Sequence, residues 1–163
     1  MAREIERKFL VVNDDWKKGK TSSKHIVQGY IVGNGSTVRI RLCTDASGQK
    51  TAFWAIKSKR TYSDGAIDRD EWPSVQAEDD DAAEGKGKNE IPVNDAEEML
   101  KKVCAYSFEK TRHYVTANGK KWTVDELIDD DKRKYPEFMI ADKGATNGSV
   151  RPYGRTELNE VRH

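Results

Sequence analysis

The chain has 163 residues, with 29 Lys and Arg, 28 Asp and Glu, and a formal net charge of +1 at pH 7. This length suits a single domain over residues 1–163, and the near-neutral charge argues against a generally basic nucleic-acid-binding protein. The sequence has no apolar run of the length that a membrane helix needs, so we expect no membrane span. Two cysteines, Cys43 and Cys104, are too few for a disulfide-stabilised fold, and we expect a cytoplasmic protein.

In chain order, the first half of the sequence predicts strands separated by short turns. Each strand is marked by β-branched and aromatic residues or by alternation of apolar and charged residues. The predicted strands span residues 3–12, 24–32, 37–42, 51–58 and 66–72. Clusters of Gly, Asn, Asp and Ser supply the turns, of which Gly33-Asn34-Gly35-Ser36 is the clearest.

The middle of the chain changes character. Pro73 ends the preceding strand, and residues 73–89 are rich in Asp, Ala, Glu, Gly and Lys without apolar periodicity, which predicts a mobile insertion loop. Asn94 and Asp95 are suited to cap a helix. Apolar residues then recur at helical spacing from Ala96 to Val103, which predicts a helix of two to three turns.

Strands return after this helix. Alternating patterns predict strands over 106–117 and 120–127, joined by the hairpin signal Asn118-Gly119, with one more short strand over 137–142. Residues 143–163 are polar, with little to bury. About eight strands with short connections favour an antiparallel sheet, either a barrel or a sandwich.

Charged residues occupy neighbouring same-face positions on strand after strand. These sets are Glu4/Glu6 with Lys8, Arg39/Arg41, Lys57/Lys59, Arg69/Glu71 and Lys110/Arg112. If the sheet closes into a barrel, strand parity can place them inside, with the apolar parity outside under helices and loops. Converging Arg and Lys suit phosphate oxygens, and paired carboxylates suit Mg²⁺ or Mn²⁺. The pattern therefore predicts a site for a polyphosphate group and a divalent metal, although each set taken alone also fits a solvated strand face.

The segment Glu4-Ile5-Glu6-Arg7-Lys8-Phe9-Leu10-Val11 resembles the N-terminal signature ExExK of the CYTH superfamily, the triphosphate tunnel metalloenzymes. Further matching segments follow in the family's order: Gln28-Gly29-Tyr30-Ile31, Val38-Arg39-Ile40-Arg41-Leu42, Ala55-Ile56-Lys57, Arg69-Asp70-Glu71-Trp72, Glu90-Ile91-Pro92, Glu109-Lys110-Thr111-Arg112-His113-Tyr114 and Trp122-Thr123-Val124-Asp125-Glu126-Leu127. The resemblance covers roughly residues 2–128 and is to short bacterial members. It implies a mainly β (α+β) fold, an antiparallel eight-stranded closed tunnel with packing helices.

The resemblance also implies roles for individual residues. The residues implied to bind phosphate are Lys8, Arg39, Arg41, Lys57, Arg69, Lys110 and Arg112. The carboxylates implied to hold Mg²⁺ or Mn²⁺ are those of Glu4, Glu6, Glu71, Asp125 and Asp142. The implied catalytic set is Glu4, Glu6, Lys8 and Lys57.

The function implied is metal-dependent hydrolysis of a small-molecule triphosphate, inorganic or organic, inside the tunnel. An adenylate cyclase that makes cyclic AMP from ATP is one alternative. A non-catalytic phosphate-chain-binding module is another, because Gly144 stands where the family places a second acid after Asp142. Contact with nucleic acid is expected only through a 5′-triphosphate end, and a homodimer is left open.

Overall fold

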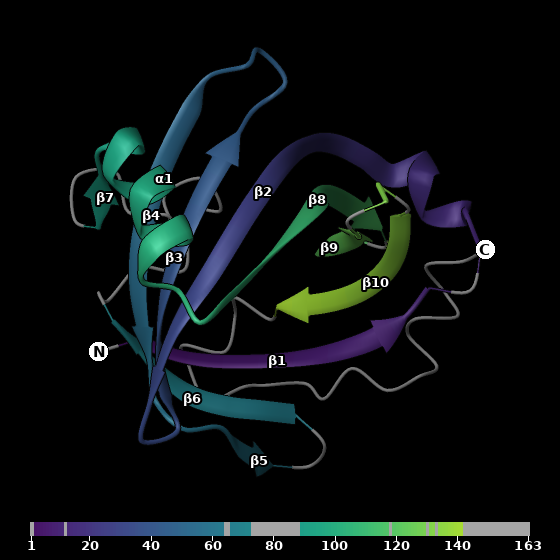
Figure 1. Cartoon of the computed structure of the whole chain (residues 1–163). Coiled ribbons are helices and arrows are strands. Elements are labelled where there is room, and N and C mark those ends of the chain that lie inside the picture. The colour runs from purple at the N-terminus through teal and green to yellow at the C-terminus, as the bar shows by residue number, and fades with distance from the viewer. Residues whose placement is uncertain are drawn as a thin grey trace.

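The computed structural model describes residues 2–11, 13–63, 66–72, 89–117, 119–129, 131–132 and 134–141. Ten strands, one α-helix and one 3-10 helix lie in this part of the chain (Figure 1). They are β1 (Ala2–Leu10), η1 (Asp15–Gly19), β2 (Lys20–Gly33), β3 (Ser36–Thr44), β4 (Lys50–Lys57), β5 (Thr61–Ser63), β6 (Ala66–Trp72), β7 (Glu90–Ile91), α1 (Val93–Lys102), β8 (Tyr106–Ala117), β9 (Lys120–Ile128) and β10 (Lys134–Ala141). For β1 and β10 the description consists of the backbone and its register.

The long strands predicted from alternation are all present. The short strands β5 and β7 and the 3-10 helix η1 were not predicted, and β10 begins at Lys134 rather than at residue 137. The predicted mobile loop covers residues 73–89, of which 73–88 lie outside the described residues. The last residue, Asn89, is buried and donates from its Nδ2 to the carbonyl oxygen of Trp54 (2.9 Å).

The sheet closes on itself. Its hydrogen-bonded order is β5-β6-β1-β10-β9-β8-β2-β3-β4-β7, and β6 also pairs with β4, where Ile56 lies opposite Trp72 and Lys57 opposite Glu71. Every one of these pairings is antiparallel. The strands β1, β10, β9, β8, β2, β3, β4 and β6 therefore form a closed antiparallel ring of eight, which confirms the predicted fold class.

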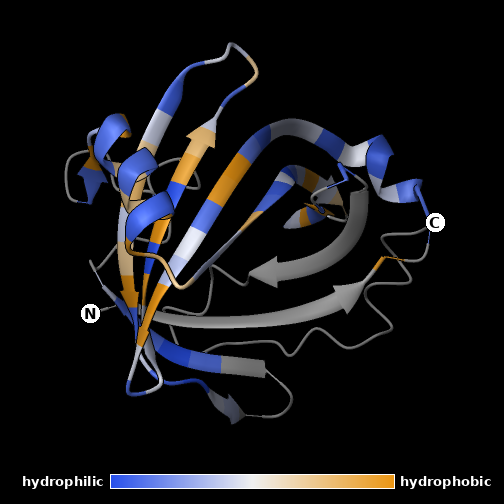
Figure 2. Cartoon of the chain, in the orientation of Figure 1, coloured by the Kyte–Doolittle hydropathy of each residue, from blue (hydrophilic) through white to orange (hydrophobic). Residues whose placement is uncertain are grey.

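Helices cover the outer face of this ring. Helix α1 lies beside β3 and β4 (Figure 1), and its buried Ala96 packs with Ile40, Leu42 and Ala52. On the other side, Trp16 of η1 packs with Val115, Trp122 and Val124. Orange and blue segments alternate along β2, β3 and β4 (Figure 2), as expected for strands with one apolar and one polar face. The residues that alternate with these packed residues along each strand lie on the inner face of the ring.

Helix α1 starts earlier than predicted. Its N-cap is Pro92, with no side-chain capping hydrogen bond, so the predicted capping role of Asn94 and Asp95 is wrong. Proline fits there because a helix start leaves backbone N–H groups unbonded in any case. The acidic Asp95 in the first turn still lies where the helix dipole favours negative charge.

Two tight hairpins have the predicted turn chemistry. Gly33 pairs with Ser36 across Asn34 (φ 51°) and Gly35 (φ 75°), the two positive φ values that such a turn requires. In the second hairpin, Ala117 pairs with Lys120, and Gly119 has φ 71°. These turns fix the registers of β2 with β3 and of β8 with β9, and these registers position the charged side chains of the inner face.

Gly29 of β2 allows α1 to approach the sheet closely. A Cβ atom at this position would lie 2.8 Å from both Cys104 Sγ and Leu100 Cδ2. We expect Gly29→Ala to lower the free energy of unfolding by about 1–3 kcal/mol through overpacking. Urea unfolding measures the change, and Gly33→Ala in the same strand is the matched control because nothing lies within 4 Å of its Cβ position. Equal stability of the two variants would contradict the expectation.

Within the described ranges, no helix combines the length and apolar character required to cross a membrane.

Candidate functional site

The register brings the predicted charged residues onto one face of the ring. Paired residues of antiparallel strands share a face. The cross-strand pairs that link neighbouring strands around the ring include Lys57 with Glu71, Arg69 with Glu4, Arg112 with Asp125 and Lys110 with Ile26. By parity, the inner face carries Glu4, Glu6, Lys8, Arg39, Arg41, Lys57, Arg69, Glu71, Lys110, Arg112 and Asp125. Glu4, Glu6 and Lys8 are located by register alone. Asp142 lies outside the described residues.

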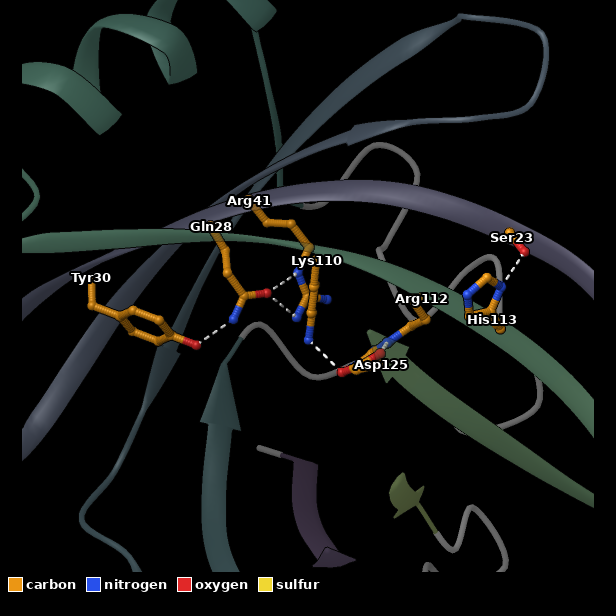
Figure 3. Close-up of polar contacts among 8 residues, drawn as sticks. All are labelled: Ser23, Gln28, Tyr30, Arg41, Lys110, Arg112, His113 and Asp125. Atoms are coloured by element: carbon orange, nitrogen blue, oxygen red, sulfur yellow. Dashed lines mark hydrogen bonds and ion pairs between the residues drawn. The ribbon is translucent and has the colours of Figure 1, made fainter. Parts of the chain in front are cut away.

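Asp125 is the centre of the tightest ionic cluster on this face (Figure 3). Lys110 Nζ lies 2.6 Å from Asp125 Oδ2, and Arg112 donates from Nε to Oδ1 (2.7 Å) and from a terminal nitrogen to Oδ2 (2.8 Å). Asp125 is only 1% exposed. Charge-assisted hydrogen bonds at these distances are the strong kind, so this carboxylate holds both cations in place.

The environment lowers the pKa of both Asp125 and Lys110 in this cluster. Although burial alone would raise the pKa of Asp125, the charges and hydrogen bonds of Arg112 and Lys110 outweigh it and hold that pKa well below its ordinary 3.8. Burial, together with the nearby Arg112 and Arg41, lowers the pKa of Lys110 well below its ordinary 10.5. An anion bound beside Lys110 would favour its charged form.

The depressed pKa of Asp125 predicts how stability depends on pH. A carboxylate with a lowered folded-state pKa contributes stability above its unfolded-state pKa and loses it as the pH falls towards the folded-state value. We expect the difference in unfolding free energy between the wild type and Asp125→Asn to be constant from about pH 7 to 5. It should shrink as the pH falls below about 4. Urea unfolding across this range checks it, and a difference that never shrinks would contradict it.

A second hydrogen-bonded chain orients Arg41. Arg41, 6% exposed, donates from Nε and from a terminal nitrogen to Gln28 Oε1 (3.2 and 3.1 Å). Gln28 in turn donates from Nε2 to the hydroxyl oxygen of Tyr30 (2.6 Å), as Figure 3 shows. Because Gln28 is neutral, it fixes the guanidinium without cancelling its charge.

Glu71 joins a third group of charges, contributed by three neighbouring strands. Its Oε1 lies 3.6 Å from Lys57 Nζ and 3.6 Å from a terminal nitrogen of Arg39. These distances are longer than those at Asp125, and the Glu71 side chain is 20% exposed. Glu71 therefore binds its neighbouring cations less tightly than Asp125 does.

The candidate metal ligands differ in how well they fit a divalent ion. Both oxygens of Asp125 accept short hydrogen bonds from cations, so Asp125 does not fit as a metal ligand in this arrangement. The contacts of Glu71 with cations are longer, at 3.6 Å, so its carboxylate can still bind a metal ion. Glu71 lies opposite Ala2, which is two positions along β1 from Glu4. Among the residues whose side chains are described, no cluster of three or more His, Cys, Asp or Glu forms a metal site.

Sequence analysis missed two positions on this face. Gln28 was noted within a matching segment but received no role, because a search for charges passes over an amide. Glu137 of β10 lies opposite Asp125 and opposite Leu10, a register position on the inner face. The predicted strand began at Glu137, whereas β10 begins at Lys134, so the prediction placed Glu137 at a strand end. Its pairing with Asp125 was therefore not predicted.

His113 and the two cysteines are not members of the ionic cluster of Asp125, Lys110 and Arg112. His113 has the outer parity, and its ring contacts Ser23 Oγ, Glu126 and the ring of Trp16. Cys43 and Cys104 are free cysteines, and Cys43 is buried with Ile26 and Phe53. This small apolar cluster lies on the inner face beside Lys110, opposite Ile26, and contributes to the low polarity around that lysine.

Comparison with known proteins finds a relative by sequence and solved structures with a similar fold. The chain is 30% identical over 132 residues to a protein of Acetivibrio thermocellus named inorganic triphosphatase, covering 78% of this chain and 67% of that protein. No family model matches the chain. Its fold is similar to that of a conserved hypothetical protein from Pyrococcus furiosus (TM-score 0.52, 14% identity, 97% of this chain and 85% of that one). A protein from Pyrococcus horikoshii OT3 has the same TM-score and coverage at 12% identity.

Proposed function

The chain belongs to the CYTH superfamily, and from this premise we propose that it hydrolyses a triphosphate, with inorganic tripolyphosphate as the first substrate to test. One observation carries the proposal: cations from four strands meet on the inner face of the closed ring. These are Arg39 and Arg41 of β3, Lys57 of β4, Arg69 of β6, and Lys110 and Arg112 of β8. The relative named inorganic triphosphatase supports the same substrate class.

These side chains suit the chemistry of phosphate chains. Phosphoryl transfer depends mainly on positioning and on neutralising charge, and guanidinium forks match phosphate oxygens. In the proposed reaction, a water oxygen bonds to the terminal phosphorus while the bond from that phosphorus to the bridging oxygen breaks. Inorganic phosphate and diphosphate are released. Arg41, Lys110 and Arg112 would bind the triphosphate and neutralise the charge that develops on the departing oxygen.

We also propose Mg²⁺ or Mn²⁺ as the cofactor. Glu4, Glu6 and Glu71 would hold it, since carboxylate oxygens are the preferred ligands of these hard ions and the three residues share the inner face on the adjacent strands β1 and β6. When bound, the ion would neutralise phosphate charge and make a bound water more acidic. The hydrogen-bonded Asp125 is left out of this set.

The metal proposal predicts the behaviour of the pair Glu4 and Glu6. Changing both to Gln removes two negative charges from the proposed site but keeps the side-chain shape. We expect metal-dependent phosphate release to fall at least about a hundredfold, with the fold intact by circular dichroism. The matched control is Glu97→Gln with Glu98→Gln on α1. Wild-type activity in the Glu4/Glu6 variant would remove both residues from the metal site.

The products formed from ATP separate hydrolysis from cyclisation. A hydrolase releases phosphate from the terminal position and leaves ADP, whereas a cyclase releases diphosphate and leaves cyclic AMP. We expect ADP and phosphate when the chain is incubated with ATP and Mn²⁺ or Mg²⁺ and the products are separated by ion-exchange chromatography. Cyclic AMP as the main product would replace the proposed hydrolysis with the cyclase reaction.

A further inference from the structure

We propose that Tyr30, Tyr106 and Phe108 form an aromatic platform that stacks the base of a nucleoside triphosphate, so that the substrate of this site carries an aromatic group. The inference rests on the proposed function because it assigns the organic part of the substrate for the same phosphate-binding face. It departs from the name of the relative, which specifies an inorganic triphosphate.

The three rings form one continuous stack. The ring centroids of Tyr30 and Tyr106 are 5.2 Å apart at an interplanar angle of 24°, and those of Tyr30 and Phe108 are 6.1 Å apart at 20°. Tyr30 is therefore the middle ring. Register puts Tyr30 opposite Tyr106 and Gln28 opposite Phe108, so all three rings share the inner face with the cations.

The outermost ring is open to solvent. Tyr106 is 52% exposed although it lies on the inner parity and stacks on Tyr30. Just before Tyr106 in the chain, the N–H of Ala105 donates to the carbonyl oxygen of Tyr30, and Cys104 packs in the outer apolar cluster beside α1. About half of Tyr106 thus stays exposed, and one more aromatic ring could stack on this residue and extend the platform.

The platform is continuous with the phosphate-binding cations. Tyr30 accepts the hydrogen bond of Gln28, which holds Arg41, and Lys110 Nζ lies 6.0 Å from the centroid of the Phe108 ring. Tyr30 also lies opposite Arg39. A phosphate chain held by Arg41 and Lys110 would therefore bring an attached organic group to these rings. Inorganic tripolyphosphate has no group that could use them.

A nucleobase is the ligand chemistry that fits. Bases stack on aromatic side chains without needing specific hydrogen bonds, and stacking on one ring changes affinity by about five- to hundredfold. The three rings of the platform bring no charged group of their own, which favours a flat neutral ring over a second anion. Purines, with the larger π-surface, should bind more tightly than pyrimidines.

The test compares the binding of ATP and tripolyphosphate in EDTA by isothermal titration calorimetry, so that turnover does not contribute. We expect Tyr106→Leu to weaken ATP binding about five- to hundredfold and to leave tripolyphosphate binding within about twofold. Tyr106→Phe keeps the ring and should retain ATP affinity. The matched control is Tyr62→Leu, since Tyr62 is a 69% exposed tyrosine of β5.

The outcomes separate this inference from the proposed function. Equal weakening of ATP and tripolyphosphate by Tyr106→Leu, or no change in either, would overturn the platform even if tripolyphosphate is hydrolysed. A selective loss of ATP binding in a chain that hydrolyses no triphosphate would support the platform and contradict the proposed hydrolysis. Loss of ATP affinity in Tyr106→Phe would assign the effect to the hydroxyl and would also overturn stacking.

Discussion

Asp125→Ala is expected to lower the free energy of unfolding by about 3–5 kcal/mol, the largest effect of any substitution considered for this chain. The variant would leave Lys110, 3% exposed, and the nearby Arg112 without the carboxylate that accepts three hydrogen bonds from them at 2.6–2.8 Å. Two partly desolvated cations would then repel each other. Urea unfolding at pH 7 and low salt measures the loss.

Two comparisons sharpen this expectation. Glu98→Ala is the control, because Glu98 pairs with Lys102 at 3.6 Å with both side chains 70% exposed, and such surface pairs contribute at most about 1 kcal/mol. Tripolyphosphate should stabilise Asp125→Ala more than the wild type, since the ligand would replace the missing negative charge. A variant as stable as Glu98→Ala would show that Asp125 does not hold the cluster.

Arg41→Ala is expected to weaken tripolyphosphate binding about ten- to hundredfold. Losing one charge-assisted hydrogen bond to phosphate costs roughly 1.5–3 kcal/mol, and Arg41 is held toward the inner face by two hydrogen bonds to Gln28. Calorimetric titration with tripolyphosphate gives the change in dissociation constant. Gln28→Leu should produce a smaller loss in the same direction, because the guanidinium would remain but lose its orientation.

The control for Arg41 is Arg60→Ala, which also removes one arginine but from an exposed position between β4 and β5. It leaves the formal net charge equal to that of Arg41→Ala. Equal affinities in the two variants would mean that binding responds to total charge alone and that Arg41 makes no contact with the phosphate chain.

Strand parity was the most informative property of the sequence. Alternation along 37–42 placed Arg39 and Arg41 on one face and Ile40 on the other, and the structure has this arrangement because the apolar parity packs under α1. Asn118-Gly119 likewise predicted the hairpin from β8 to β9. These features depend on neighbours in the chain, so local patterns suffice to predict them.

Features that depend on pairing between distant strands could not be predicted in this way. The ring closes where Lys57 meets Glu71, and no local signal specifies that contact. Asp125 could be predicted to share a face with Arg112, but its engagement by both Arg112 and Lys110 follows from the cross-strand geometry. Its metal role was implied by the family resemblance, whereas in this structure its two oxygens accept hydrogen bonds from Lys110 and Arg112.

The most direct test of the central claim is phosphate release from tripolyphosphate by the purified chain, with Mg²⁺ or Mn²⁺ and with EDTA as the control. If the inner face binds and hydrolyses a triphosphate with metal carboxylates on β1, the wild type should release phosphate only with metal. The Glu4→Gln, Glu6→Gln variant should then release little or none. No release by the wild type with either metal, or equal release in EDTA, would contradict metal-dependent triphosphate hydrolysis at this site.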